Sequence, residues 1–392
     1  MRISEVEVHE FTYELDDVGT KNGNWVYAPG ERMEPPGFVL TIRTADGTEG
    51  HYRGFMFTPP MVGQIGMVAE EHLLGRDPLE REGIWKDLWR ALRHTDHLGV
   101  GPIDVALWDL AGTHHDASVS TLLGGYREAL PTYASTFFVD EQSDGLASPQ
   151  AFADYAADCL DRGYDGFKFH GHPDSRPEFD VAICEALDRR VGGEMDLMID
   201  SSSLYWTYAD AIEVGRAVDD LDFFWYEDPL CDGGVSSAMT RKLVAELETP
   251  VIGLEHVRTG PFGSVDHMVN ESADFVRASA HLDGGITGVM KTAGAVQGFG
   301  LDVELLLGGP AHAHVMSALR NSSYFEHGLL HPEVDWLHDQ AFEGSPESLA
   351  DDATMPVPEG PGLGVEIDWA FVEERLTDHT VIDASSSTSS FP

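Results

Sequence analysis

The sequence predicts an α/β protein, built as a modified TIM-type (β/α) barrel with an N-terminal α+β capping domain. From about residue 130 onward, eight short apolar segments recur at a spacing of roughly 25–30 residues, and helical patterns lie between them. Residues 1–128 instead show two strand patterns followed by three helical patterns. We therefore expect the capping domain at 1–128 and the barrel at 129–349.

The capping domain begins with strand patterns at residues 6–13 and 37–44, where β-branched residues alternate with polar ones. Asp46-Gly47 marks a turn after the second. Residues 18–30 are rich in Gly, Asn and aromatic residues, and we expect a mobile loop there. Helical patterns follow at residues 60–74, 78–92 and 102–113.

The barrel strands are expected at eight short apolar runs. These runs are 131–135, 166–170, 196–200, 223–227, 250–255, 274–279, 302–307 and 322–326. An open doubly wound sheet is the competing topology, but no G-x-G-x-x-G motif follows the first strand. Residues from about 350 to 382 are expected to complete the capping domain, and the Ser/Thr-rich end, 383–392, to be disordered.

The chain carries 68 Asp and Glu against 24 Lys and Arg, for a formal net charge of −44. This charge argues against nucleic acid and anionic membranes as partners, because both require a basic face. No apolar run approaches a membrane span, and the first ten residues have a strand pattern, so we expect a cytoplasmic protein. The acid excess is spread along the whole chain, which favours adaptation to high salt and a haloarchaeal origin over an ordinary acidic protein.

Three carboxylates end three successive predicted barrel strands, namely Asp200, Glu227 and Glu255. In a (β/α) barrel the carboxyl ends of the strands meet at one mouth, where the chemistry collects. Three oxygen ligands suit a hard divalent cation, and Mg²⁺ is preferred because it keeps positions open for water or substrate. The alternative is that these acids cap helices or pair with Arg.

Lys168 and His170 lie two residues apart on the second predicted barrel strand, so their side chains share one face. A lysine near a metal and shielded from water has a reason for a lowered pKa, and we expect Lys168 to act as a base. A structural salt bridge is the alternative.

These residues, with several short motifs, make the chain resemble the enolase superfamily in its mandelate racemase/muconate lactonizing enzyme-like branch. The matching motifs are Leu122-Leu123-Gly124-Gly125, Glu227-Asp228-Pro229, Gly284-Gly285-Ile286-Thr287 and Pro361-Gly362-Leu363-Gly364. The resemblance implies a capping domain whose loops cover the barrel mouth and one essential Mg²⁺ held by three acids. It also implies removal of the proton alpha to a carboxylate, giving a metal-stabilised enediolate.

The resemblance assigns Asp200, Glu227 and Glu255 as metal ligands, and places Lys168 and His170 at the positions of a Lys-x-Lys pair. It also implies that Glu326 hydrogen-bonds the substrate carboxylate, for which we expect a protonated side chain. A buried structural acid is the alternative for Glu326.

One departure from the family pattern concerns a second base. Many members carry an Asp–His dyad at the ends of the sixth and seventh strands, where this sequence has Ser279 and Leu306. Neither residue transfers a proton at neutral pH, which argues against two-base racemisation. His312 is a candidate general acid, whereas His314 matches a histidine commonly found on the helix after the seventh strand and is expected to be structural.

The remaining candidates are expected to bind substrate. They are Lys21, Trp25, Tyr27 and Arg53 from the capping loops, with His172 and His314 near the mouth. An ordinary surface loop is the alternative for the first three.

The leading hypothesis is a Mg²⁺-dependent dehydratase that converts an aldonate-type sugar acid into a 2-keto-3-deoxy acid. A cycloisomerase of a sugar-acid lactone or anhydro sugar acid is the alternative, because it also needs only one base. A catalytically silent ligand-binding relative is a further alternative. Family members are often dimers or octamers, so we expect a homo-oligomer.

Overall fold

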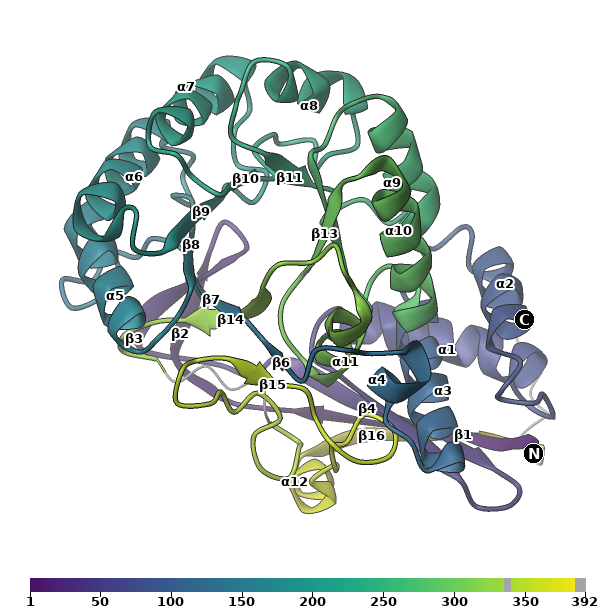
Figure 1. Ribbon diagram of the computed structural model, residues 1–392. Helices are drawn as coiled ribbons and strands as arrows, with labels where there is room; N and C mark the ends of the chain where they lie inside the picture. The colour runs from purple at the N-terminus through teal and green to yellow at the C-terminus, as the bar shows by residue number, and fades with distance from the viewer. Residues whose placement is uncertain (335–339, 385–392) are drawn as a thin grey trace.

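A curled, eight-stranded parallel sheet forms the barrel in the computed structural model, which describes residues 1–334 and 340–384. The strands lie in the order β13-β12-β11-β10-β9-β8-β7-β14, and Figure 1 shows them as a ring with helices outside. The strands are β7 (Thr132–Thr136), β8 (Gly166–His170), β9 (Asp196–Asp200), β10 (Trp225–Glu227), β11 (Val251–Gly253), β12 (Phe275–Ala278), β13 (Asp302–Leu305) and β14 (Phe325–Leu330). The predicted barrel is confirmed.

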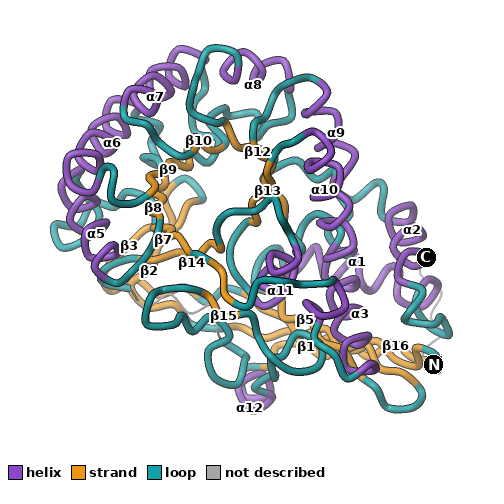
Figure 2. The backbone as a smooth tube through the Cα atoms, in the orientation of Figure 1, coloured by secondary structure: helices purple, strands orange, loops and turns teal. Residues whose placement is uncertain are grey.

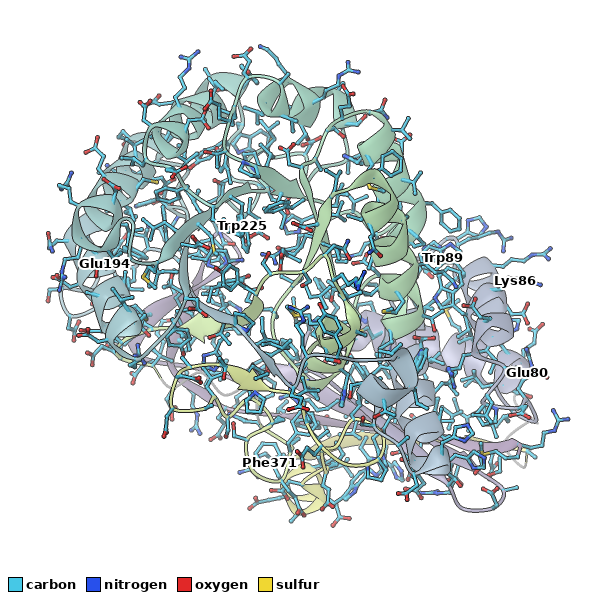
Figure 3. All side chains as sticks on the ribbon, in the orientation of Figure 1. Glu80, Lys86, Trp89, Glu194, Trp225 and Phe371 are labelled. Atoms are coloured by element: carbon cyan, nitrogen blue, oxygen red, sulfur yellow. The ribbon has the colours of Figure 1, made fainter. Side chains whose placement is uncertain are left out.

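Helices cover the outside of the sheet, as the tube view also shows (Figure 2). They are α5 (Pro149–Asp161), α6 (Pro177–Val191), α7 (Tyr208–Asp220), α8 (Ser237–Val244), α9 (Gly260–Val269), α10 (Gly285–Phe299) and α11 (Pro310–Ala318). The ring is filled by large side chains, with Tyr133, Met198, Trp225 and Ile252 in one buried cluster. Figure 3 shows Trp225 inside the ring and Glu194 at its edge. The barrel is therefore a packed core, and its chemistry is confined to the strand ends.

Two buried carboxylates bridge the seam between β13 and β14. Glu304 accepts hydrogen bonds from the backbone amides of Ser323 (2.7 Å) and Tyr324 (3.3 Å). Glu326 accepts one from the amide of Leu307 at 2.6 Å. These bonds occupy backbone donors at the seam that would otherwise be buried without partners.

The capping domain is a four-stranded antiparallel sheet covered by helices. The sheet order is β16-β1-β4-β5, so the C-terminal strand lies beside the N-terminal one. Its strands are β1 (Ile3–Thr12), β4 (Pro36–Thr44), β5 (Glu49–Gly54) and β16 (Leu376–Asp383), and the helices are α1 (Thr58–His72), α2 (Arg81–Ala91), α3 (Val100–His115), α4 (Val119–Leu123) and α12 (Trp369–Glu374). A two-stranded pair joins β6 (Ala129–Leu130) to β15 (Met355–Pro356).

The prediction of a mobile loop at residues 18–30 is wrong. Those residues belong to a hairpin of β2 (Leu15–Lys21) and β3 (Asn24–Met33). Asn22 and Gly23 form its turn with φ of 52° and 84°. This Asn-Gly pair between two strand-forming runs is itself a hairpin signal.

Capping domain and barrel are joined by contacts that α2 and α3 make with the start of α10. Asp104 accepts a hydrogen bond from the amide of Thr287 at 2.8 Å, and Trp85 donates to the carbonyl of Gly284 at 2.8 Å. Gly285 adopts φ 76°, and a Cβ there would lie 2.3 Å from Asp104. The Gly-Gly-Ile-Thr motif thus permits the close approach that docks the capping domain on the barrel.

Of the expected disordered tail, residues 385–392 lie outside the described residues. Across the described parts of the chain, no helix has the length and apolar character needed to span a bilayer.

Candidate active site

The three strand-end carboxylates converge at the barrel mouth. Asp200 and Glu227 end β9 and β10 as direct neighbours in the parallel register, and Glu255 lies two residues beyond β11. One oxygen of each lies within 4.8 Å of those of the other two. Burial, together with the nearby Asp200 and Glu227, raises the pKa of Glu255 despite the opposing effect of His256. A divalent cation among these oxygens would relieve that crowding, so the donor set fits Mg²⁺.

Lys168 lies beneath this cluster and is fully buried. Its Nζ is 3.0 Å from Glu227 Oε2, 2.9 Å from Glu326 Oε1 and 3.6 Å from Asp200 Oδ2. Burial alone would lower the pKa of Lys168, but Glu227 and Glu326 raise it well above its ordinary value. The expected lowering of this pKa is therefore wrong for the arrangement seen here, because acids surround the ammonium.

Glu326 joins the site as a carboxylate. Burial would raise its pKa, but Lys168 and Arg277 hold it at about 2. The expectation that Glu326 is protonated is therefore wrong for this arrangement. Its Oε1 contacts Lys168, and its Oε2 is held by the Leu307 amide.

Arg277, in the middle of β12, is a site residue that sequence reasoning missed. Its Nε lies 2.6 Å from Glu227 Oε1 and its Nη2 lies 2.6 Å from Oε2, a bidentate pair that is fully buried. Nη2 also donates to the Tyr133 hydroxyl at 3.2 Å. A charged residue inside an apolar strand is the signal that could have identified it, because such a charge needs a buried partner.

His170 is oriented by the backbone. Its Nδ1 donates to the carbonyl of Thr136 at 2.6 Å, so Nε2 is the nitrogen turned toward the carboxylates, 3.3 Å from Asp200 Oδ2. The ring of Phe138 packs on it at 4.6 Å. The tautomer and the direction of the ring are thereby set by the fold.

A cavity of about 170 Å³ opens above these groups. Its polar side consists of Asn24, His170, Asp200, Ser202, Glu255 and Glu326. Its apolar side includes Trp25, Phe55, Phe138, Leu306, Leu307 and Leu329. The capping hairpin and the segment after β5 therefore cover the mouth, and Leu306, at the position where the resemblance places the dyad histidine, lines the cavity.

Strained backbone marks three of the strand ends around this cavity. Asp228, Leu254 and Leu307 are non-glycine residues with φ of 35°, 84° and 58°. Such conformations cost of order 1–3 kcal/mol each and persist where the surrounding fold enforces them. Here they lie next to Glu227, Glu255 and Leu306.

Of the six predicted substrate-binding residues, only Trp25 lines this cavity. Lys21 instead pairs with Glu141 at 2.8 Å and Asp174 at 2.7 Å, which ties the hairpin tip to the loops after β7 and β8. Tyr27 is buried and packs on the ring of His331 at 4.6 Å. These two residues hold the cap in place.

The other three predicted contacts also lie elsewhere. Arg53 is buried beside the rings of Tyr13 and Phe55 and lines a separate cavity of about 40 Å³. His172 Nδ1 accepts a hydrogen bond from the amide of Asp174 at 3.1 Å. His314 accepts one from the Ser120 amide and donates to the Leu363 carbonyl, which makes it structural.

His312 does not suit the general-acid role considered for it. Its Nε2 accepts a hydrogen bond from the Ala280 amide at 2.8 Å, and its Nδ1 donates to the Leu307 carbonyl at 2.9 Å. Burial lowers its pKa to about 4. Both nitrogens of this neutral ring form hydrogen bonds to backbone groups just beyond the ends of β12 and β13. Ser279, at the other dyad position, bonds to Asp283 through its amide.

Comparison with known proteins matches both parts of the chain. The model of the family "Enolase C-terminal domain-like" matches residues 151–371, and that of the mandelate racemase / muconate lactonizing enzyme N-terminal domain matches residues 19–124. The crystal structure of D-glucarate dehydratase from Agrobacterium tumefaciens complexed with magnesium superposes with a TM-score of 0.86 at 31% identity, covering 96% of this chain and 100% of that one.

Two curated relatives carry different activities in their names. Arabinonate dehydratase of Saccharolobus solfataricus is 27% identical over 358 residues, which cover 88% of this chain and 92% of that protein. D-galactarolactone cycloisomerase of Agrobacterium fabrum is 29% identical over 325 residues, covering 78% and 82%. With both domain families matched in their expected order, the chain belongs to the mandelate racemase/muconate lactonizing enzyme-like branch of the enolase superfamily.

Proposed function

We propose that this protein is a Mg²⁺-dependent dehydratase of an aldonate-type sugar acid, which removes the proton alpha to the carboxylate and yields a 2-keto-3-deoxy acid. The observation that carries the proposal is the cavity itself. It brings Asp200, Glu255, His170 and Glu326 to one polar side, with Lys168 directly beneath. The similarity to arabinonate and D-glucarate dehydratases supports this reaction class.

Asp200, Glu227 and Glu255 would hold the metal, because their oxygens converge within 4.8 Å. When bound, Mg²⁺ supplies positive charge beside the carboxylate of the substrate. Negative charge grows on the oxygens of that carboxylate as the alpha proton leaves. Arg277 fixes Glu227 by two hydrogen bonds and so positions this ligand. Lys168 is the buried cation shared by Glu227 and Glu326.

We assign proton transfer to His170, which replaces Lys168 as the expected base. His170 lines the cavity, whereas Lys168 is fully buried among carboxylates. His170 Nε2 takes the proton from C2, and the electrons of that C–H bond move toward the substrate carboxylate, giving an enediolate. The electrons then return to form the C2–C3 double bond as hydroxide leaves C3. The same proton then joins the hydroxide as water if both groups depart from one face, and the enol tautomerises to the keto acid.

Cycloisomerisation is the second candidate, favoured by one observation and one relative. The cavity wall at Leu306 and Leu307 carries no proton-transfer group. The site therefore offers a single base, and cycloisomerisation, like dehydration, needs only one. The relative named D-galactarolactone cycloisomerase shares the family. The two candidates differ in whether the C3 hydroxyl is lost.

The test is incubation of the purified protein with a library of aldonates, aldarates and sugar-acid lactones, with Mg²⁺ at molar KCl. We expect a 2-keto-3-deoxy product from at least one sugar acid, and no product from the matched His170→Asn variant. Proton NMR in D₂O identifies both product and exchange at C2. A ring-opened or isomerised product without water loss would replace the dehydratase with the cycloisomerase. Metal and ligand binding without turnover of any substrate would favour a silent relative.

We also propose a salt-adapted, cytoplasmic enzyme of haloarchaeal type, which the charge of −44 supports. A homo-oligomer, dimer or octamer, stays a prediction, and light scattering at molar KCl tests it.

A further inference from the structure

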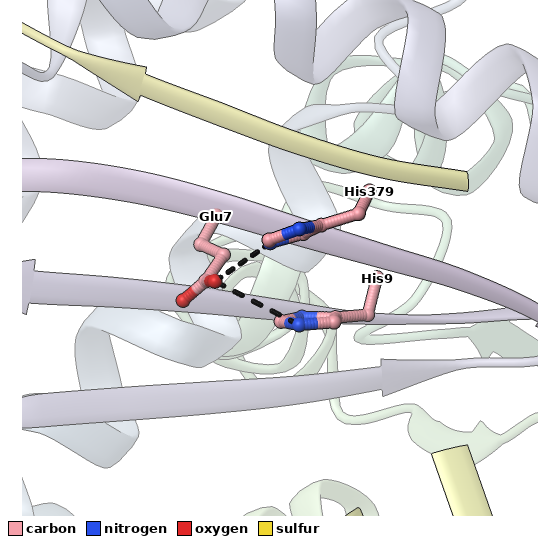
Figure 4. Close-up of side chains that lie close together, drawn as sticks. All are labelled: Glu7, His9 and His379. Carbon is pink, nitrogen blue, oxygen red and sulfur yellow. Dashed lines mark hydrogen bonds and ion pairs between the residues drawn. The ribbon is translucent and has the colours of Figure 1, made fainter. Parts of the chain in front are cut away.

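A second cluster of metal-type ligands lies on the sheet of the capping domain, away from the barrel mouth. Glu7 and His9 project from the same face of β1, and His379 lies directly opposite His9 on β16. One ligand atom of each residue lies within 4.8 Å of the other two. Figure 4 shows both rings directed at the Glu7 carboxylate.

The two imidazoles approach one and the same oxygen. Glu7 Oε1 lies 2.7 Å from His379 Nε2 and 3.7 Å from His9 Nε2. Adjacent ligand atoms of a tetrahedral zinc ion with bonds near 2.0–2.1 Å are ~3.3 Å apart. The two observed separations bracket this value, so small side-chain movements would bring all three atoms to one ion.

The rings are held in place before any ion binds. His9 and His379 stack at 4.3 Å with an interplanar angle of 20°, and the edge of Trp369 packs against His9 at 5.1 Å. Glu7 Oε2 lies 3.5 Å from Arg43 Nη2, which leaves Oε1 directed at the rings. A site whose ligands are already oriented loses little conformational entropy on binding.

The His9 side chain is only 13% exposed, yet among the described residues no hydrogen bond reaches its ring. Its Nδ1 is buried without a partner, and its Nε2 faces Glu7 beyond hydrogen-bond distance. Buried polar groups in folded proteins nearly always have partners, so this ring calls for an explanation. An ion would give Nε2, the nitrogen that faces Glu7, the partner that it lacks.

We propose that Glu7, His9 and His379 bind a divalent transition-metal ion of the zinc type, and that this ion fastens the C-terminal strand β16 to β1. Two imidazoles and one carboxylate suit Zn²⁺, whereas Mg²⁺ prefers oxygen ligands alone. The site is thus chemically distinct from the all-carboxylate cluster at the barrel mouth. Because its ligands come from both ends of the chain, the bound metal stabilises the closed capping sheet.

The experiment titrates Zn²⁺ into the tag-free, full-length protein by calorimetry, with excess Mg²⁺ present to fill the barrel site. We expect His9→Ala and His379→Ala each to weaken Zn²⁺ binding at least about tenfold relative to the wild type. The matched control is His115→Ala, since His114 and His115 also form a close ring pair, at 4.8 Å, but belong to no such three-ligand group in the described chain. That variant should bind Zn²⁺ like the wild type.

His256→Ala tests the competing location, because Asp228, Glu255 and His256 form another ligand group at the barrel mouth. Loss of Zn²⁺ binding in His256→Ala, or less than tenfold weakening in either His9→Ala or His379→Ala, would overturn the proposal. Hydrogen exchange gives the second readout: Zn²⁺ should slow amide exchange in β16 of the wild type and leave it unchanged in His379→Ala. Equal slowing in both proteins would contradict the fastening of β16.

Discussion

Arg277 donates a hydrogen bond of 2.6 Å to each carboxylate oxygen of Glu227, and both side chains are fully buried at the barrel mouth. Lys168 reaches the same carboxylate from another side at 3.0 Å. Glu227 is therefore oriented by two cations while it belongs to the three-carboxylate cluster. This relationship links the stability of the barrel to the geometry of the proposed metal ligands.

Removing Arg277 should destabilise the protein and weaken the metal site together. Arg277→Met leaves a buried Glu227 with Lys168 alone, and breaking a buried ion pair costs about 3–5 kcal/mol. Urea unfolding measures the stability, and Mg²⁺ titration should show at least about tenfold weaker binding. The control is Arg189→Met, because Arg189 pairs with Glu185 at the surface and should contribute less than about 1 kcal/mol. Equal losses in the two variants would contradict this account.

Metal binding and proton transfer should separate between Asp200 and His170. Asp200→Asn removes a charged ligand and should weaken Mg²⁺ binding strongly. His170→Asn should keep Mg²⁺ affinity within a few-fold while abolishing exchange of the substrate C2 proton in D₂O, because the variant lacks the proposed base. Calorimetry and NMR give the two readouts. Exchange of the C2 proton at the wild-type rate in His170→Asn would contradict this assignment and indicate Lys168 as the base.

The neutral ring of His312 should make stability sensitive to acid. Burial lowers its pKa to about 4 from an ordinary value near 6.5, so below pH 6.5 the unfolded chain takes up a proton that the folded chain refuses. This contribution is fully present above pH 6.5 and is lost as the pH falls toward 4, for a total of about 3 kcal/mol.

His312→Gln offers a donor and an acceptor but no titration. Its destabilisation relative to the wild type should therefore shrink between pH 8 and pH 5, by up to about 2 kcal/mol. Urea unfolding at both pH values gives the comparison, with the exposed His115→Gln as control. A pH-independent difference for His312→Gln would show that the ring titrates normally.

Salt should stabilise the protein strongly. The Debye length falls from about 10 Å at 0.1 M to about 3 Å at 1 M salt, which screens the repulsion within a chain of net charge −44. The thermal midpoint should rise steadily between 0.1 M and 3 M KCl, and circular dichroism measures it. An unchanged midpoint in dilute buffer would contradict salt adaptation.

Two of the strands that carry the site, β8 and β9, were predictable from sequence to the residue. Residues 166–170 and 196–200 form β8 and β9 as expected, because each is a buried apolar run that ends in a functional side chain. The convergence of Asp200, Glu227 and Glu255 followed from the geometry of parallel strands. Local pattern and a repeated topology were enough for these features.

Contacts between residues that lie far apart in the sequence could not be predicted from local patterns. Lys21 was expected to face substrate, but its partners Glu141 and Asp174 lie more than a hundred residues away. Arg277 was overlooked because nothing adjacent in sequence indicates Glu227 as its partner. His312 could be placed near the mouth, but only the backbone at Ala280 and Leu307 decides which way its nitrogens point.

The most direct measurement is the anomalous scattering of Mn²⁺ in crystals soaked with this ion as a stand-in for Mg²⁺. We expect one strong peak at the barrel mouth, coordinated by oxygens of Asp200, Glu227 and Glu255 together. A mouth without a peak, or an ion that contacts only one of the three carboxylates, would contradict it.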